Sequence, residues 1–164
     1  MDKTPKDSPA AGKPACGGAG DGGDAMVLAR DEQAVLQVLR FICLTYAKPQ
    51  AHSWEQALAM AADAFGPAVG GEVAVTVMQL MRAIRVTRRT TFRFRDPNCA
   101  CCRTRLSEVE AKVITLVRAA RKDPLRPARV DALILTEGGP TAAVLAEADR
   151  LAGVLERRLI ARAA

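Results

Sequence analysis

The stretch PTAAVLAEADRLAGVLERRL, residues 140–159, carries the cleanest helical pattern in the chain. Apolar residues recur in it at intervals of three and four, which places them on one side of an α-helix. They are Val144, Ala148, Leu151, Leu155 and Leu159. Pro140 precedes them, and proline is favoured in the first turn of a helix. The pattern predicts a final helix that packs on other helices, with a stripe long enough to form a dimer seam as well.

Five earlier segments repeat this pattern in weaker form. The predicted helices cover residues 31–48, 53–65, 72–86, a segment after 107, and 130–134. Ser53 with Gln56, and Ser107 with Glu110, have the spacing of capping boxes, and Gly70-Gly71 predicts a break before the third helix. With one tryptophan, one tyrosine and four phenylalanines, the core must be built from Ala, Val, Leu and Met. We therefore predict an all-α fold, a bundle of five to six helices.

The chain divides into a tail and one domain. Residues 1–30 are rich in Gly, Ala, Pro and charged residues, so we expect a disordered tail in which Cys16 has no role, followed by a single helical domain over 31–164. The sequence has no long apolar run or signal peptide, which predicts no membrane span. An odd count of five cysteines argues against a disulfide framework and favours a cytoplasmic protein.

The periodicity changes in TTFRFRDPNCACCRTRLSEVE, residues 90–110. Phe92 and Phe94 alternate with arginines, which is the two-residue rhythm of an extended strand or arm. Asp96-Pro97-Asn98 predicts a turn, and three cysteines follow it. We expect residues 88–105 to stand out from the bundle as a stiff, positively charged finger with its sulfur-rich part at the base.

The cysteines allow three interpretations. Cys99 and Cys102 have the C-x-x-C spacing of half a zinc site, and Cys101 is a candidate third ligand, although neighbouring side chains usually diverge. Cys43, His52 or a second copy of the chain would have to complete the site. Redox sensing is the second interpretation, because arginines and a helix start favour thiolates. In the third, the cysteines are inert small residues in a turn.

Arginines dominate the same region. Residues 82–106 carry eight basic groups and one acidic group, whereas the net charge of the whole chain is +6. Such a cluster suits phosphate, which arginine binds in a bidentate fork, although it also fits a solvated face balanced by the acidic first helices. The candidate nucleic-acid or anion-binding residues are Arg82, Arg85, Arg88, Arg89, Arg93, Arg95, Arg103 and Arg105.

Catalytic motifs are missing from the sequence. It has a single histidine and no metalloprotease, nucleophile-elbow or dinucleotide-binding motif, so we predict that the protein is not an enzyme. The leading expectation is a small cytoplasmic regulator that binds nucleic acid, such as DNA, or another polyanion through the arginine segment, with zinc or redox chemistry at the cysteines. The alternative is a non-catalytic helical adaptor that binds a partner protein as a homodimer or hetero-complex.

Overall fold

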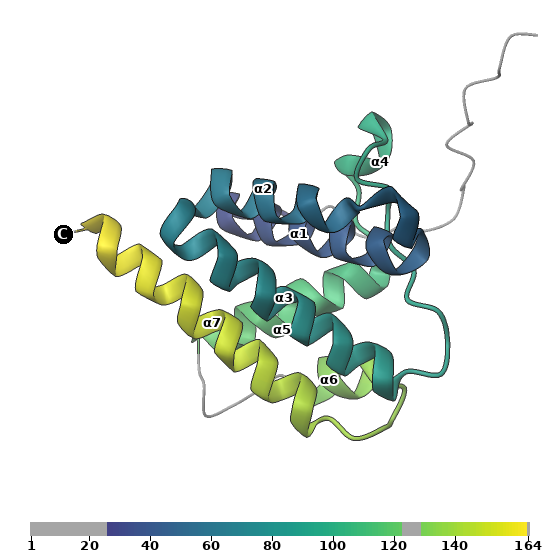
Figure 1. The fold of residues 1–164 in the computed structure, drawn as a ribbon. Helices are drawn as coiled ribbons and strands as arrows, with labels where there is room; N and C mark the ends of the chain where they lie inside the picture. The colour runs from purple at the N-terminus through teal and green to yellow at the C-terminus, as the bar shows by residue number, and fades with distance from the viewer. Residues whose placement is uncertain (1–25, 123–128, 164) are drawn as a thin grey trace, which may run out of the picture.

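The computed structural model describes residues 26–122 and 129–163, with side chains as far as Arg157. This part of the chain is helical and contains no strand, which confirms the predicted all-α bundle (Figure 1). Six helices are longer than one turn, and α4 is a single turn. The elements are α1 (Arg30–Ala47), the 3-10 helix η1 (Pro49–Ala51), α2 (Ser53–Phe65), α3 (Pro67–Thr87), α4 (Ala100–Arg103), α5 (Glu108–Lys122), α6 (Arg129–Leu135) and α7 (Ala142–Ala163).

The core lies between α1, α3, α5 and α7. Helix α1 packs on α2 and α3, α3 also packs on α7, and α5 packs on both α6 and α7. Leu39, Leu80, Leu116 and Leu151, one from each of the four central helices, are all fully buried. The core is thus assembled from small and medium aliphatic side chains, as the composition predicts.

The apolar stripe of α7 belongs to this core. Val144, Ala148, Leu151 and Leu155 are all buried, and the side chain of Leu159 is outside the described part. The stripe is therefore not exposed as the dimer seam that the sequence suggests. It is used inside one chain because α3 and α5 both pack against it.

Two local predictions are wrong. Gly70-Gly71 does not break the chain, since α3 begins at Pro67 and runs through both glycines. A Cβ atom on Gly70 would lie 2.6 Å from the backbone of Ala62, so this glycine marks the close approach of α2 and α3. Ser53 is not an N-cap either. It is the buried first residue of α2, and His52, with a φ of 49°, occupies the cap position.

The predicted tail falls mostly outside the described residues, as do Cys16 and the segment between α5 and α6. Helix α1 begins at Arg30, one residue before the predicted start. Within the described ranges, no helix combines the length and the apolar character that crossing a bilayer requires.

The two glycines of α3 provide a matched test of its packing. Gly70→Ala should destabilise the protein by roughly 1 to 3 kcal/mol, because the added methyl forces α2 and α3 apart. Gly71 has nothing within 4 Å of its would-be Cβ. Gly71→Ala should therefore be neutral or stabilise by up to about 1 kcal/mol through helix propensity. Urea unfolding of both variants checks this, and equal effects would contradict the close helix crossing.

Candidate functional site

Residues 88–107, which we call the arm, connect α3 to α5, and Glu137 fixes the start of this connection. The Glu137 carboxylate accepts hydrogen bonds from the backbone N–H of Arg89 at 2.9 Å and of Thr90 at 3.2 Å. It also accepts one from the Thr90 hydroxyl and forms an ion pair with Arg88 at 3.2 Å. These contacts, led by the Thr90 hydroxyl, lower the pKa of Glu137. The loop after α6 thus holds the arm where it leaves α3.

The middle of the arm is extended but pairs with no strand. Phe92 is buried and Arg93 is exposed, as the alternation predicts. The backbone bonds instead to the start of α5. The Ser107 hydroxyl donates to the carbonyl of Arg93 at 3.0 Å, and the N–H of Arg95 donates to Glu110 Oε1 at 3.0 Å.

Ser107 and Glu110 form the predicted capping box. The N–H of Ser107 donates to Glu110 Oε2 at 2.7 Å, and the N–H of Glu110 donates to Ser107 Oγ at 3.2 Å. This arrangement satisfies the free N–H groups at the start of α5. Because both residues also bind the arm, the cap fixes the arm and the helix together.

A buried arginine on α1 completes the attachment. Arg40 and Glu110 are both fully buried and form an ion pair of 2.7 Å from Nε to Oε1. Arg40 Nη2 donates to Glu110 Oε2 at 2.9 Å, which makes the pair bidentate. Its Nη1 donates to the carbonyl of Arg103 at 2.9 Å, and its Nη2 donates to the carbonyl of Arg105. We call this set of contacts the Arg40 clamp.

Sequence reasoning missed the Arg40 clamp. The available signal was a charged residue inside the otherwise largely apolar run AVLQVLRFIC, residues 34–43. An arginine at such a position must be paired if it is buried, but its partner is 70 positions away. Hydrophobic periodicity therefore identifies Arg40 as an unusual residue but does not identify Glu110 as its partner.

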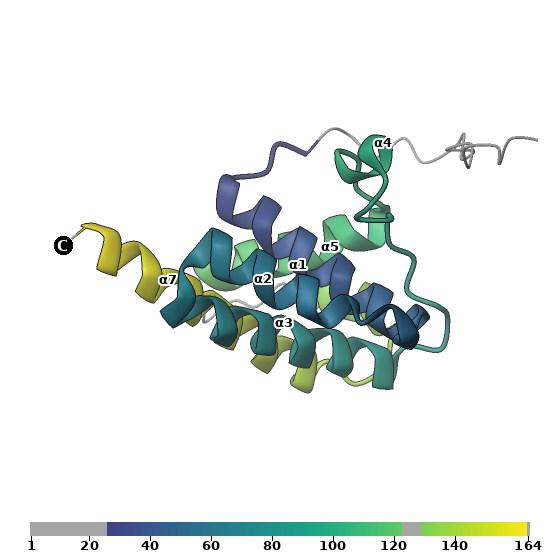
Figure 2. The same ribbon diagram turned by 45° about the horizontal axis from the view of Figure 1, so that its top comes forward.

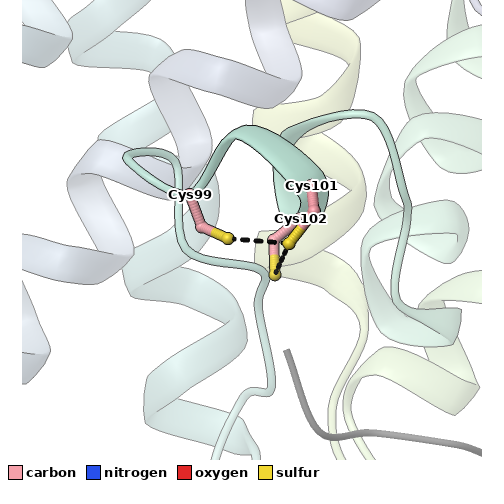
Figure 3. A group of neighbouring side chains, drawn as sticks. All are labelled: Cys99, Cys101 and Cys102. Carbon is pink, nitrogen blue, oxygen red and sulfur yellow. Dashed lines mark hydrogen bonds between the residues drawn. The ribbon is translucent and has the colours of Figure 1, made fainter. Parts of the chain in front are cut away.

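The cysteine turn follows the arm's middle segment. The N–H of Asn98 donates to Asp96 Oδ1 at 2.9 Å, which closes the predicted turn, and Cys99 occupies the N-cap position of α4. Figure 3 shows the side chains of Cys99, Cys101 and Cys102 directed toward one another. Their sulfur atoms all lie within 4.8 Å.

The sulfur spacing is compatible with a metal. Sγ of Cys101 lies 3.0 Å from Sγ of Cys99 and 3.9 Å from Sγ of Cys102. Four sulfurs at about 2.3 Å from a tetrahedral zinc ion are about 3.8 Å apart. The expectation that the side chains of Cys101 and Cys102 diverge is wrong, because the turn of α4 brings both sulfurs to the same side.

The thiols of Cys99 and Cys102 are electrostatically unequal. The backbone amide and then the thiol of Cys102, both hydrogen-bonding toward the sulfur of Cys99, lower the pKa of Cys99. The same thiol–thiol hydrogen bond raises the pKa of Cys102, and Arg95 opposes this change only weakly. Neighbouring sulfur and amide groups, rather than the expected field of the arginines, therefore dominate the thiol chemistry.

Cys43 and His52 do not join the sulfur cluster. Cys43 is 5% exposed in the core, and burial raises the pKa of its thiol well above the usual value. This confirms the interpretation of Cys43 as a small buried hydrophobe. His52 is exposed at the start of α2. Neither is part of the only group of metal-ligating side chains found in the described residues.

The candidate arginines fall into two groups. Six of them have exposed side chains, and we call this set the arginine surface: Arg82, Arg85, Arg89, Arg93, Arg103 and Arg105. Arg85 lies over the ring of Tyr46, 3.9 Å from its centre. The other two are half-buried. Arg88 is the Glu137 partner, and Arg95 has a buried Nε without a hydrogen-bond partner.

The acidic residues of α1 do not balance the arginine surface. Glu32 pairs with Arg118 at 2.6 Å, and Asp31 pairs with Arg121 at 2.6 Å, so both bind α5. Among the described ion pairs, no carboxylate contacts a side chain of the arginine surface. Within the described residues, these six guanidinium groups therefore form no ion pair with a carboxylate.

The finger is oriented opposite to the expectation, which placed its sulfur-rich part at the base. Figures 1 and 2 show α4 projecting beyond α1 and α2 as the outermost part of the arm. The cysteines thus lie at the tip, and the Arg40 clamp and Glu137 hold the base.

Comparison with known proteins adds no assignment, because no family model, curated protein or solved structure matches the chain.

The Arg40 clamp is tested by a double-mutant cycle. Arg40→Met should cost about 3 to 5 kcal/mol of stability, because it leaves Glu110 charged and buried. Arg40→Met with Glu110→Gln should cost less than the sum of the two single changes. The control, Arg150→Met, removes an exposed partner of Glu147 at 3.7 Å and should cost less than about 1 kcal/mol. Denaturant unfolding measures all four variants; additive single effects would refute a coupled pair.

The thiol asymmetry predicts an order of reactivity. In reduced, metal-free protein near neutral pH, iodoacetamide should label Cys99 before Cys102, because the lower pKa of Cys99 gives it more of the reactive thiolate. The difference should shrink as pH rises and both thiols ionise. Peptide mass spectrometry over a pH series follows each site, and faster labelling of Cys102 at neutral pH would contradict the assignment.

Proposed function

We propose that the protein is a small, non-catalytic intracellular regulator that binds nucleic acid through the arginine surface, with a thiophilic metal stabilising the cysteine turn. One observation carries the proposal. Six exposed guanidinium groups flank or belong to an anchored arm, and no described carboxylate neutralises them.

The charge distribution favours a polyanion as ligand. Eight of the chain's basic residues are concentrated in positions 82–106, and the acidic residues of α1 pair elsewhere. An unneutralised cluster attracts phosphates over distance and releases counterions on binding. Guanidinium groups also match phosphate oxygens in bidentate geometry.

The way in which the arm is held supports the same function. Glu137, Glu110 and Arg40 bind mainly its backbone groups. Arg93, Arg103 and Arg105 are therefore fixed at their main chains while their side chains face outward. A ligand would meet a pre-ordered surface and lose less conformational entropy on binding.

The proposal predicts that reversing charge on the arm weakens binding. Arg93→Glu with Arg103→Glu should lower the affinity for a short DNA or RNA duplex at least tenfold in low salt. It should also lower the slope of log affinity against log salt by about one for each phosphate that the variant no longer binds. Fluorescence anisotropy with a labelled duplex across a salt series measures both quantities.

A matched control separates the arm from general charge. Lys122→Glu with Arg129→Glu makes the same change in net charge at exposed positions at the far end of α5 and the start of α6. This variant should bind nearly as well as the unmodified protein. Equal weakening in both variants would show that net charge, rather than the arginine surface, determines binding, and undiminished binding by the arm variant would refute the proposal.

A different surface favours the adaptor function as second candidate. Helices α2 and α3 pack side by side, and both expose large apolar side chains. Trp54, Leu58, Val75 and Met78 are between 40 and 48% exposed. Binding through this face would depend little on salt. Trp54→Glu with Leu58→Glu would weaken any self-association seen by sedimentation velocity while leaving nucleic-acid affinity unchanged.

A further inference from the structure

We propose that Cys99 and Cys102 form a reversible disulfide with each other when the protein meets a hydroperoxide, which makes the tip of the arm a site of covalent oxidation. This inference goes beyond the proposed function and depends neither on nucleic-acid binding nor on a bound metal. It rests on the geometry of the turn that carries the two residues and on the contact between their sulfur atoms.

The turn places the two residues at the separation that a disulfide requires. The N–H groups of Cys102 and Arg103 both donate to the carbonyl of Cys99, at 3.1 and 2.9 Å. A turn of this kind brings the Cα atoms of its first and fourth residues to within about 7 Å, and bonded cysteines have Cα atoms about 4.4 to 6.8 Å apart. Residues three apart on a helical turn also direct their side chains to the same side. Rotation of the two side chains therefore suffices to form the bond.

The sulfur atoms are close together and within reach of solvent. Sγ of Cys99 and Sγ of Cys102 lie within 4.8 Å, and the thiol of Cys102 donates a hydrogen bond toward the sulfur of Cys99. Both residues carry thiols. Helix α4 has no buried residue, and it projects beyond α1 and α2 (Figure 1). A small oxidant therefore reaches this pair without opening the core.

The other cysteines of the described residues do not compete for this bond. Cys101 is already disulfide-bonded. Adjacent residues in any case have Cα atoms about 3.8 Å apart, which is closer than in ordinary disulfides. Cys43 is 5% exposed in the core, and a thiol in apolar surroundings is inert. The pair that an oxidant joins is therefore Cys99 with Cys102.

The reaction with a hydroperoxide balances in two steps. The sulfur of one thiolate attacks the peroxide, so that an S–O bond forms, the O–O bond breaks and an alcohol or water leaves. The sulfur of the second cysteine then attacks the sulfenic acid. An S–S bond forms, the S–O bond breaks, and the leaving hydroxide takes the proton of the second thiol to become water. The two thiols are oxidised by two electrons in total, and the peroxide is reduced by the same number.

The disulfide cross-links a part of the fold that has no apolar packing. Its ring includes Cys99 at the N-cap position and the first three residues of α4. Arg103, a member of the arginine surface, follows the ring directly. Oxidation therefore restrains the main chain next to an exposed arginine, and reduction removes this restraint.

The test uses the full-length chain with a chelator and without nucleic acid. The protein is treated with stoichiometric hydrogen peroxide near neutral pH, its thiols are blocked with N-ethylmaleimide, and tryptic peptides are analysed by mass spectrometry. The peptide Asp96–Arg103 contains Cys99, Cys101 and Cys102. We expect Cys99 and Cys102 to lose their label together, with the mass change of two lost hydrogen atoms. Glutathione should restore the label at both positions.

Single variants identify the bonded pair. In Cys99→Ser and in Cys102→Ser, the thiol that is left should accumulate sulfenic acid, which dimedone traps. Cys43→Ala is the control and should form the disulfide like the unmodified chain.

Three outcomes would overturn the inference: no reaction with peroxide, a bond between Cys99 and Cys101 instead, or direct conversion of either thiol to sulfinic acid. Duplex affinity plays no part in this measurement. Disulfide formation in a chain that binds no duplex would therefore support this site and refute the nucleic-acid function, and duplex binding by a chain that forms no disulfide would do the reverse.

Discussion

The ion pair between Arg40 and Glu110 joins three parts of the chain that are distant in sequence: helix α1, the cap of α5 and the end of the cysteine turn. A buried ion pair is not in itself a strong source of stability, since desolvating two charges offsets most of their attraction. Its value here is geometric. Glu110 accepts hydrogen bonds from Arg40, from the N–H of Ser107 and from the N–H of Arg95. Arg40 in turn donates to two carbonyls of the turn. An apolar pair would fill the same volume and leave all of these backbone groups without partners.

The arm is consequently held mainly by its backbone rather than by its arginine side chains. Its two anchoring carboxylates, Glu137 and Glu110, both accept main-chain N–H groups of the arm. Only Arg88, at the very start, contributes a charged side chain to this anchoring. Several acidic groups of the bundle pair with α5, as Glu32 does with Arg118 and Asp131 does with Lys112. Some charged groups thus form ion pairs within the bundle, whereas the guanidinium groups of the arginine surface face solvent.

The features that the sequence predicted correctly are mainly those that interactions between neighbouring residues determine. The helices follow from apolar periodicity, because an amphipathic face must be buried, and the Ser107–Glu110 cap follows from three-residue spacing. The C-x-x-C spacing pointed to Cys99 and Cys102 in the same way, but the convergence of Cys101 with them was not predicted. Two of the errors arise where a distant contact decides. Gly70 fits inside α3 because the backbone of Ala62 lies against it, and Arg40 is buried because Glu110 lies opposite it. Neither of these contacts can be recognised from the pattern of neighbouring residues in the sequence.

The tip of the arm has little packing to hold it in place. Helix α4 has four residues and none of them is buried. So short a helix gains too few hydrogen bonds to offset the entropy of nucleation, and the core adds no apolar packing to it. The Asp96–Asn98 turn and the Arg40 clamp fix its two ends, which leaves the residues between them dependent on their own side chains. Those side chains include three cysteine sulfur atoms within 4.8 Å of one another (Figure 3). Where a small structure lacks a core, a cross-link through sulfur or a metal is the usual means of holding it, and the cysteines lie at the place in this fold where such a cross-link adds most to order.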